Sequence, residues 1–213
     1  LLNAVEKHPL FIYEKCCLIQ GESGKIVEVR IRERKGSLGL CSCCKKPASG
    51  YDRLPERRFQ FVPLWGMAVY FFYALRRVAC VDCGIVVEEV PWALGKRPLT
   101  KSFAYFLAQW AKHMSWKETA VRFHTSWEMV YRSVKHIVEW GRERMDLSGI
   151  TAIGVDEVCW KQGKFMTVVY QINDGMKRLL WAGEERTEES FQQFFAWLGE
   201  ERSSLIEFVC SDM

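Results

Sequence analysis

Two pairs of closely spaced cysteines constrain this chain of 213 residues more strongly than any other feature of its sequence. The pairs are Cys41-x2-Cys44 and Cys80-x2-Cys83, and 35 residues separate them. Because two intervening residues allow both sulfurs of a pair to reach one ion, four such cysteines typically form a structural zinc site. The alternatives are buried reduced cysteines or a redox pair, and Cys43 could replace Cys41 or Cys44. The spacing predicts a zinc-ribbon-like module with Cys41, Cys44, Cys80 and Cys83 as the zinc ligands.

The remaining cysteines and the first residues bear on the cellular compartment. The chain does not open with the charged and apolar segments of a secretion signal. A reducing compartment is therefore expected, where cysteines bind metal or lie buried more often than they form disulfides. We expect a cytoplasmic protein in which Cys16, Cys17, Cys159 and Cys210, which lack spaced partners, are core residues.

An uncharged run of 17 residues between Arg58 and Arg76 approaches the shortest length of a membrane-spanning helix. Pro63 and Gly66 interrupt this run, and β-favouring aromatic residues dominate its second half. We therefore predict two buried strands that turn near residues 64–66, and no association with a membrane.

The net charge of +4 conceals an asymmetry along the chain. Residues 1–150 hold 24 basic and 15 acidic side chains, whereas residues 151–213 hold 6 basic and 11 acidic ones. A basic first part joined to an acidic second part is typical of a polyanion-binding module followed by a carboxylate-rich one.

The middle of the chain has helical periodicity and two helix-start signals. In the capping boxes Ser115-x-x-Glu118 and Thr125-x-x-Glu128, a hydroxyl and a carboxylate satisfy the first amides of a helix. The short connection between the second and third helices indicates a helix-turn-helix corner, so the three helices should form one compact unit. The predicted helices cover residues 100–113, 116–123 and 126–140.

The third helix should bury one face and expose the other. Its buried stripe is predicted to contain Val130, Val134, Ile137 and Val138. On the exposed face Arg132 is suited to reading base edges and Lys135 to contacting phosphate. Any three-helix bundle has this geometry, so the alternative is that these charges are simply solvated. The candidate DNA-contacting residues are Arg122, Trp127, Tyr131, Arg132 and Lys135.

After Gly149 the pattern becomes that of a mixed sheet. Three strands are followed by a helix capped by Thr187 and by a final strand, and Asn173-Asp-Gly175 supplies a hairpin turn. The helix must cross over so that the final strand lies parallel to the first and next to it. The predicted strands cover residues 152–160, 164–172, 178–182 and 206–210.

Two aspartates meet in this arrangement. Asp156 lies within the first strand of the mixed sheet and Asp212 directly follows the last. Two carboxylates on neighbouring strands can hold Mg²⁺ or Mn²⁺ beside a scissile phosphate. Aspartates at strand ends also form turns, so the element order and not the residue type makes the pair notable. We predict that Asp156 and Asp212 are catalytic metal ligands.

Several different short motifs lie along the chain from about Gly39 onward. They are Cys41-x2-Cys44, Arg76-Arg77-Val78-x-Cys80-x2-Cys83, Val90-Pro91-Trp92 with Gly95-Lys96, Ser115-Trp116, Thr125-Ser126-Trp127, Ile153-Gly154-Val155-Asp156-Glu157 and Val209-Cys210-Ser211-Asp212-Met213. In these motifs the chain resembles the bacterial insertion-sequence transposases of the ISL-three family. Members of that family have a zinc module, a helix-turn-helix and a DDE catalytic domain of the ribonuclease H type.

The resemblance implies roles for particular residues. Asp156 and Asp212 match the first two catalytic aspartates, and the four paired cysteines match the zinc ligands. The family's third acidic residue, a glutamate on a later helix, has no counterpart here. Glu157 cannot replace it, because its side chain should leave the opposite face of the strand from Asp156. We therefore expect a fragment, incomplete at both ends, that is catalytically inactive alone.

The resemblance also implies partners and a cellular setting. The intact protein is expected to bind the terminal inverted repeats and the target as double-stranded DNA, as a homo-oligomer associated with the bacterial nucleoid. Its expected cofactors are structural Zn²⁺ and catalytic Mg²⁺ or Mn²⁺. The alternatives are a non-catalytic DNA-binding remnant that acts as a repressor, and a zinc-stabilised interaction protein.

The expected fold is a multi-domain α+β arrangement. A strand with alternating apolar and charged residues, Ile26 to Arg32, opens it. The predicted parts are an N-terminal strand segment at 1–36, a zinc-binding module at 37–93, a helix-turn-helix DNA-binding domain at 94–149 and the first part of a ribonuclease-H-like mixed sheet at 150–213.

Overall fold

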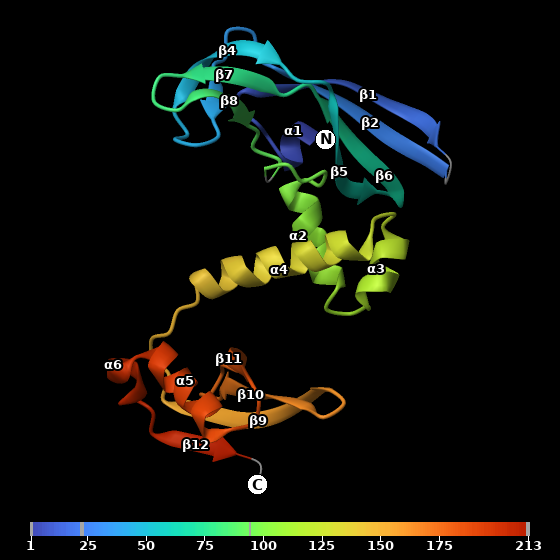
Figure 1. Cartoon of the computed structure of the whole chain (residues 1–213). Helices are drawn as coiled ribbons and strands as arrows, with labels where there is room; N and C mark the ends of the chain where they lie inside the picture. The colour runs from blue at the N-terminus through green and yellow to red at the C-terminus, as the bar shows by residue number, and fades with distance from the viewer. Residues whose placement is uncertain (1, 22–23, 94, 212–213) are drawn as a thin grey trace. The chain divides into compact units, whose positions relative to one another are not determined.

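The computed structural model describes residues 2–21, 24–93 and 95–211. The chain divides into two compact units, unit 1 at Leu1–Glu143 and unit 2 at Arg144–Met213. In unit 1 the short helix α1 (Leu2–Val5) is followed by strands and then by helices, whereas unit 2 combines a sheet with helices (Figure 1). The mixture of helices and several sheets confirms the predicted α+β class.

A four-stranded sheet in unit 1 joins segments that are far apart in sequence. Its order is β1 (Phe11–Gly21), β2 (Gly24–Glu33), β6 (Met67–Tyr73) and β5 (Arg57–Leu64). β2 contains the predicted alternating strand, and it pairs in parallel with β6. β1 was not predicted, because its polar residues break the alternation that identified β2.

The long uncharged run forms the predicted pair of strands. β5 and β6 are antiparallel, and Trp65 and Gly66 make the turn between them. The apolar residues of both strands belong to a core in which Trp92 is fully buried. The ring of Trp92 packs edge-on against Phe11 and Tyr73. Within the described residues no helix is long and apolar enough to cross a membrane.

The cysteine pairs belong to a small closed barrel of four strands. Its strands are β3 (Gly39–Cys41), β4 (Pro47–Arg53), β7 (Arg76–Cys80) and β8 (Gly84–Glu89). The β5–β6 hairpin is inserted between β4 and β7. The chain therefore leaves the barrel, completes the larger sheet and returns before the second cysteine pair.

The described residues of unit 1 include four helices. The short α1 (Leu2–Val5) precedes the sheet, and α2 (Lys101–Trp110), α3 (Trp116–Arg122) and α4 (Trp127–Glu143) follow the barrel. Thr100 caps α2, since its hydroxyl accepts a hydrogen bond from the amide of Phe103. The last three helices enclose a core built around three aromatic and aliphatic side chains, Phe103, Leu107 and Val130.

Unit 2 has the predicted element order. Its sheet order is β11 (Arg178–Glu184), β10 (Lys164–Gln171), β9 (Ala152–Lys161) and β12 (Phe208–Ser211). The helices α5 (Glu188–Leu198) and α6 (Glu200–Ser203) connect β11 to β12. Thr187 caps α5 as predicted. The pairing of β12 with β9 is parallel, which confirms the predicted crossover.

Candidate functional site

The four paired cysteines converge at one end of the barrel. Cys41 ends β3 and Cys80 ends β7, while Cys44 and Cys83 lie in the turns that lead to β4 and β8. All four sulfurs lie within 4.8 Å of one another, and those of Cys44 and Cys80 are 3.5 Å apart. Tetrahedral ligation at about 2.3 Å requires sulfurs about 3.8 Å apart, so the cluster fits a zinc ion. Cys43 is exposed and lies outside this cluster.

Hydrogen bonds prepare one thiol of the cluster for metal binding. Backbone amides of Cys44 and Cys43 donate to the sulfur of Cys41 and, with its neighbouring thiols, lower its pKa to about 6. Hydrogen bonding with Cys44, burial and the nearby Cys41 raise the pKa of Cys83 to about 12. Four thiolates this close repel one another, and a divalent cation relieves that repulsion. The cysteines without spaced partners are not in the core, because Cys16, Cys159 and Cys210 are exposed and Cys17 is half-buried.

A buried ion pair supports the barrel, and the sequence did not reveal it. The carboxylate of Glu88 on β8 accepts hydrogen bonds from the guanidinium of Arg76 at 2.7 and 2.9 Å and from the Tyr73 hydroxyl at 2.7 Å. Burial and this contact with Glu88 raise the pKa of Tyr73. Gly39 lies against the pair, since a Cβ there would lie 2.7 Å from Val78 and 3.2 Å from the carboxylate.

The helix-turn-helix corner forms largely as predicted. The Ser115 hydroxyl accepts from the amide of Glu118, and the Glu118 carboxylate accepts from the amide of Ser115. The second predicted box is wrong by one residue. Ser126, not Thr125, caps α4, because its hydroxyl accepts from the amide of Met129 at 3.3 Å.

The outward face of α4 carries the predicted candidates. Trp127, Tyr131, Arg132 and Lys135 are all exposed, and Arg122 is exposed at the end of α3. The predicted buried stripe is partly wrong. Val130 is buried, but Val138 is 53% exposed, because α4 extends beyond the helices that cover its first turns. Ser133 is buried in the stripe, and its hydroxyl donates to the carbonyl of Met129.

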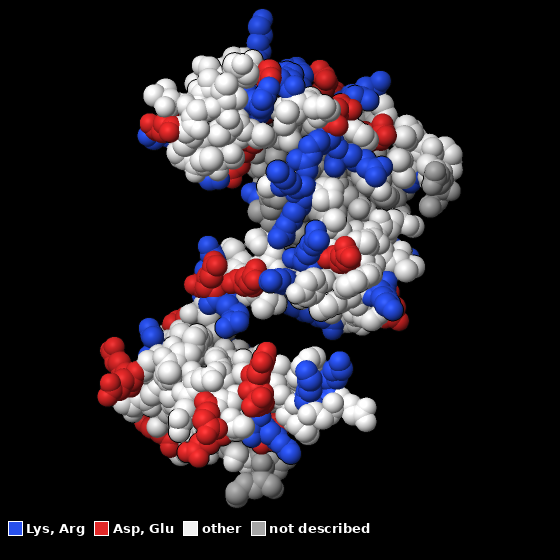
Figure 2. All heavy atoms as spheres, viewed as in Figure 1, with Lys and Arg blue, Asp and Glu red and all other residues white. Residues whose placement is uncertain are grey.

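Trp116, which is not among the predicted DNA-contacting residues, extends this face. Its ring lies 5.2 Å from that of Tyr131, and both side chains are partly exposed. Trp116 and Trp127 also line a cavity of about 560 Å³ with Met114 and Lys117. The sequence did indicate an exposed position for Trp116. The capping box places it in the first turn of α3, and no core contact was predicted for it. Lys and Arg side chains gather over the middle of unit 1 (Figure 2).

Asp156 is an exposed residue of β9. Ile153 of the same strand belongs to the core beneath α5, so alternation puts Asp156 on the opposite face of the sheet. Glu157 is on the α5 face, and its carboxylate lies 3.7 Å from the guanidinium of Arg186. On β12, Ser211 pairs with Val155, the residue before Asp156. Asp212 lies outside the described residues, so its role remains a prediction.

The second part of the chain is similar to one known family. The family model of the ISL-three DDE transposases, described as a transposase, matches residues 153–213. No curated protein and no solved structure matches the chain. The matched residues contain nearly all of the sheet of unit 2, including Asp156 and the β9–β12 pairing.

Proposed function

We propose that this chain, which belongs to the ISL-three transposase family by its residues 153–213, binds the DNA ends of an insertion sequence and takes part in their metal-dependent cleavage and transfer. The β9–β12 pairing within the family match carries this proposal. It supports the role of Asp156, because β12 runs parallel to β9 and its last residue lies opposite Val155.

The carboxylates of Asp156 and Asp212 are the proposed ligands of Mg²⁺ or Mn²⁺. Divalent ions held by these two carboxylates would supply activation of the attacking oxygen and stabilisation of the leaving oxygen of a phosphate diester. The exposure of Asp156 supports this role, since DNA can reach its face of the sheet. Glu157 takes no part, because it contacts Arg186 on the other face.

Unit 1 is the proposed DNA-binding part. A zinc ion held by Cys41, Cys44, Cys80 and Cys83 has a structural role, since four protein ligands leave no open position. The exposed side chains of α4 are proposed to enter the major groove, with Arg132 on base edges and Lys135 on phosphate. As a transposase, the protein is proposed to act in the cytoplasm at the nucleoid and to assemble as a homo-oligomer on two DNA ends.

Binding to selected duplexes tests the DNA-binding role. Repeated selection from random duplexes with residues 1–213 should yield a preferred site. Arg132→Ala should weaken binding to that site by about 5- to 150-fold and relax the preference at one position. Lys135→Ala should weaken binding to all duplexes, and Lys177→Ala in unit 2 is the matched control. Absence of binding at low salt would instead support the zinc-stabilised interaction protein.

Strand transfer tests the catalytic role. With selected end DNA and Mg²⁺, residues 1–213 should bind without joining DNA strands, because only two of the three carboxylates that the family implies are present. Strand transfer by this polypeptide that disappears in Asp156→Ala would contradict the expected inactivity, but it would support the role of Asp156.

A DNA-binding repressor without chemistry is the second candidate, and the compactness of unit 1 favours it. It predicts that residues 1–143 bind DNA as tightly as the whole chain. A shorter piece that starts after the first sheet strands is unsuitable for this test, because removal of β2 would expose Val69 and Phe71 on β6.

A further inference from the structure

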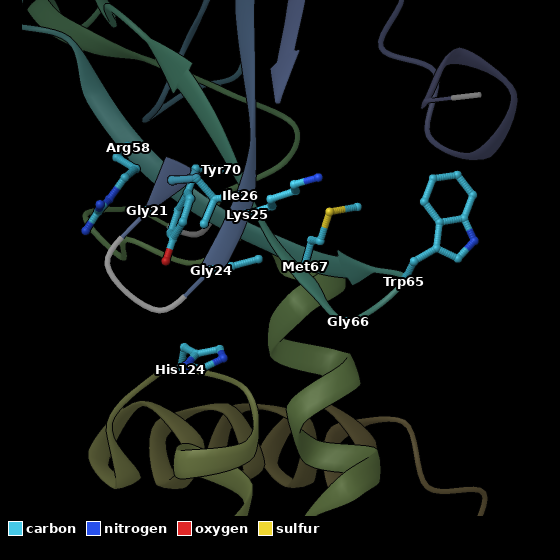
Figure 3. Close-up of a pocket in the computed structure, with 11 residues that line it drawn as sticks. Gly21, Gly24, Lys25, Ile26, Arg58, Trp65, Gly66, Met67, Tyr70 and His124 are labelled. Carbon is cyan, nitrogen blue, oxygen red and sulfur yellow. The ribbon is translucent and has the colours of Figure 1, made fainter. Parts of the chain in front are cut away.

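A groove in unit 1 lies outside all the sites described above. It has a volume of about 560 Å³ and is lined by Gly21 of β1, by the first residues of β2, by the β5–β6 turn and by His124 between α3 and α4 (Figure 3). No acidic side chain is among the described residues that line it. The side chains that give the groove its chemistry are Lys25, Arg58, Trp65, Tyr70 and His124.

Arg58 differs from most arginines in the strands of unit 1. Five of these contact a carboxylate, namely Arg30, Arg32, Arg53, Arg76 and Arg77. The guanidinium of Arg58 lies instead over the ring of Tyr70, 4.6 Å from its centroid. In the described part of the chain, no carboxylate oxygen is within 4.0 Å of the charged groups of Arg58 or Lys25. Both cations are therefore available to an anion that enters the groove.

Trp65 stands at the edge of the groove. It forms the β5–β6 turn with Gly66, and both residues have positive φ, +49° and +79°. Such a turn is normally occupied by Asn-Gly or Gly-Gly, so nothing in its backbone geometry requires an indole. The side chain is 85% exposed and points away from the sheet into solvent (Figure 3). An aromatic side chain beside unpaired cations is the composition of nucleic-acid-binding surfaces.

Hydrogen bonds join the sheet beside the groove to the turn between α3 and α4. The buried side-chain amide of Gln60 on β5 donates to the carbonyls of Phe123 and His124 at 3.0 and 3.4 Å. This contact fixes the turn between α3 and α4 against the sheet. The groove therefore keeps a fixed position relative to the turn that precedes α4.

We propose that this groove binds the phosphate backbone of the same DNA duplex, beyond the base pairs that α4 contacts. The inference rests on the proposed DNA-binding function of unit 1. Lys25, Arg58 and His124 contact phosphate oxygens, and Trp65 packs against the sugar edge of the adjoining nucleotides. Gly24 and Gly66 assist, because a Cβ at either position would meet open space, so phosphates can approach the backbone closely.

The salt dependence of binding tests this proposal on the whole chain. Each phosphate contact contributes about −0.9 to the slope of log affinity against log salt concentration. The double variant Lys25→Ala/Arg58→Ala should therefore reduce the magnitude of the slope by up to about 2 on any duplex, whatever its sequence. Arg32→Ala/Lys35→Ala is the charge-matched control, because it also removes one lysine and one arginine, at the end of β2 far from the groove.

Three further measurements separate the possible outcomes. Arg58→Lys should retain the slope, because it retains the charge. Trp65→Ala should weaken binding and shorten the protected DNA segment without changing the slope, because it removes no charge. If Lys25→Ala/Arg58→Ala changes the slope no more than the control Arg32→Ala/Lys35→Ala does, the proposed phosphate contacts of the groove are wrong, whereas the proposed role of α4 is unaffected. Tight binding of a free mononucleotide that the double variant abolishes would identify a nucleotide pocket and overturn the duplex proposal. Failure of the unmodified chain to bind any duplex would overturn both.

Discussion

At the scale of single residues, the barrel depends on the buried contact between Glu88 and Arg76. Glu88→Gln leaves the guanidinium buried without a carboxylate, which typically costs about 3–5 kcal/mol. Asp52→Asn removes the partner of the exposed Arg77 and should change the unfolding free energy by about 0–1 kcal/mol. Urea unfolding of both variants with zinc present measures the two values. Equal effects would show that the buried pair does not stabilise the barrel.

Single residues also show how far sequence reasoning reaches. The four clustered cysteines could be predicted, because a spacing of two residues is a local geometric signal. The contact between Arg76 and Glu88 could not, because the pairing of β7 with β8 and its burial arise only from the fold. The roles of Arg58 and Trp65 could not be predicted for the same reason. The groove brings together residues of β1, β2, β5 and β6 with His124, which are far apart in sequence.

At the scale of elements, the capping box of α3 gives a pH-dependent contribution. The hydroxyl and amide of Ser115 lower the pKa of Glu118 in the folded state. The contribution to stability is therefore present above the unfolded pKa, about 4.3, and is lost as the pH falls through the folded pKa. Glu118→Ala should lower the urea midpoint at pH 6, and the difference from the unmodified chain should narrow towards pH 3.5.

Glu128→Ala provides the control for this element. Glu128 also lies in the first turn of a helix, so both substitutions remove a similar interaction with the helix dipole. Its predicted capping box does not form, because Ser126 caps α4. The pH dependence of Glu128→Ala should follow that of the unmodified chain more closely. Identical pH profiles for the two variants would exclude a specific contribution from the box around Ser115.

Most helices and strands could be predicted from the sequence, but the residues at which they begin and end were less predictable. Caps and periodicity identified α2, α3 and α5, while two adjacent hydroxyl residues, Thr125 and Ser126, made the start of α4 ambiguous by one residue. The parallel β2–β6 pairing could not be predicted, because no local pattern specifies which distant strands pair.

At the scale of the whole molecule, zinc should determine whether unit 1 folds. Apparent binding free energies of structural zinc are about 10–16 kcal/mol in zinc-finger peptides, comparable to the stability of a whole domain. Chelation or Cys80→Ser should therefore remove the thermal transition of unit 1 and leave that of unit 2. Cys43→Ser should retain one zinc per chain and the full transition. Metal analysis with calorimetry distinguishes the variants, and zinc loss in Cys43→Ser would contradict the ligand set.

The insertion of the β5–β6 hairpin between the halves of the barrel has a consequence for synthesis. The intervening chain forms β5 and β6, of which β6 pairs with β2, and the ribosome releases Cys80 36 residues after Cys44. Until then the first pair can give a metal only two of its four ligands. During this interval the thiols of Cys41 and Cys44 lack the two further ligands that would complete a metal site, so they are open to oxidation or to capture by another metal. Zinc supply during translation, and not only in the finished protein, should therefore set the yield of folded chains.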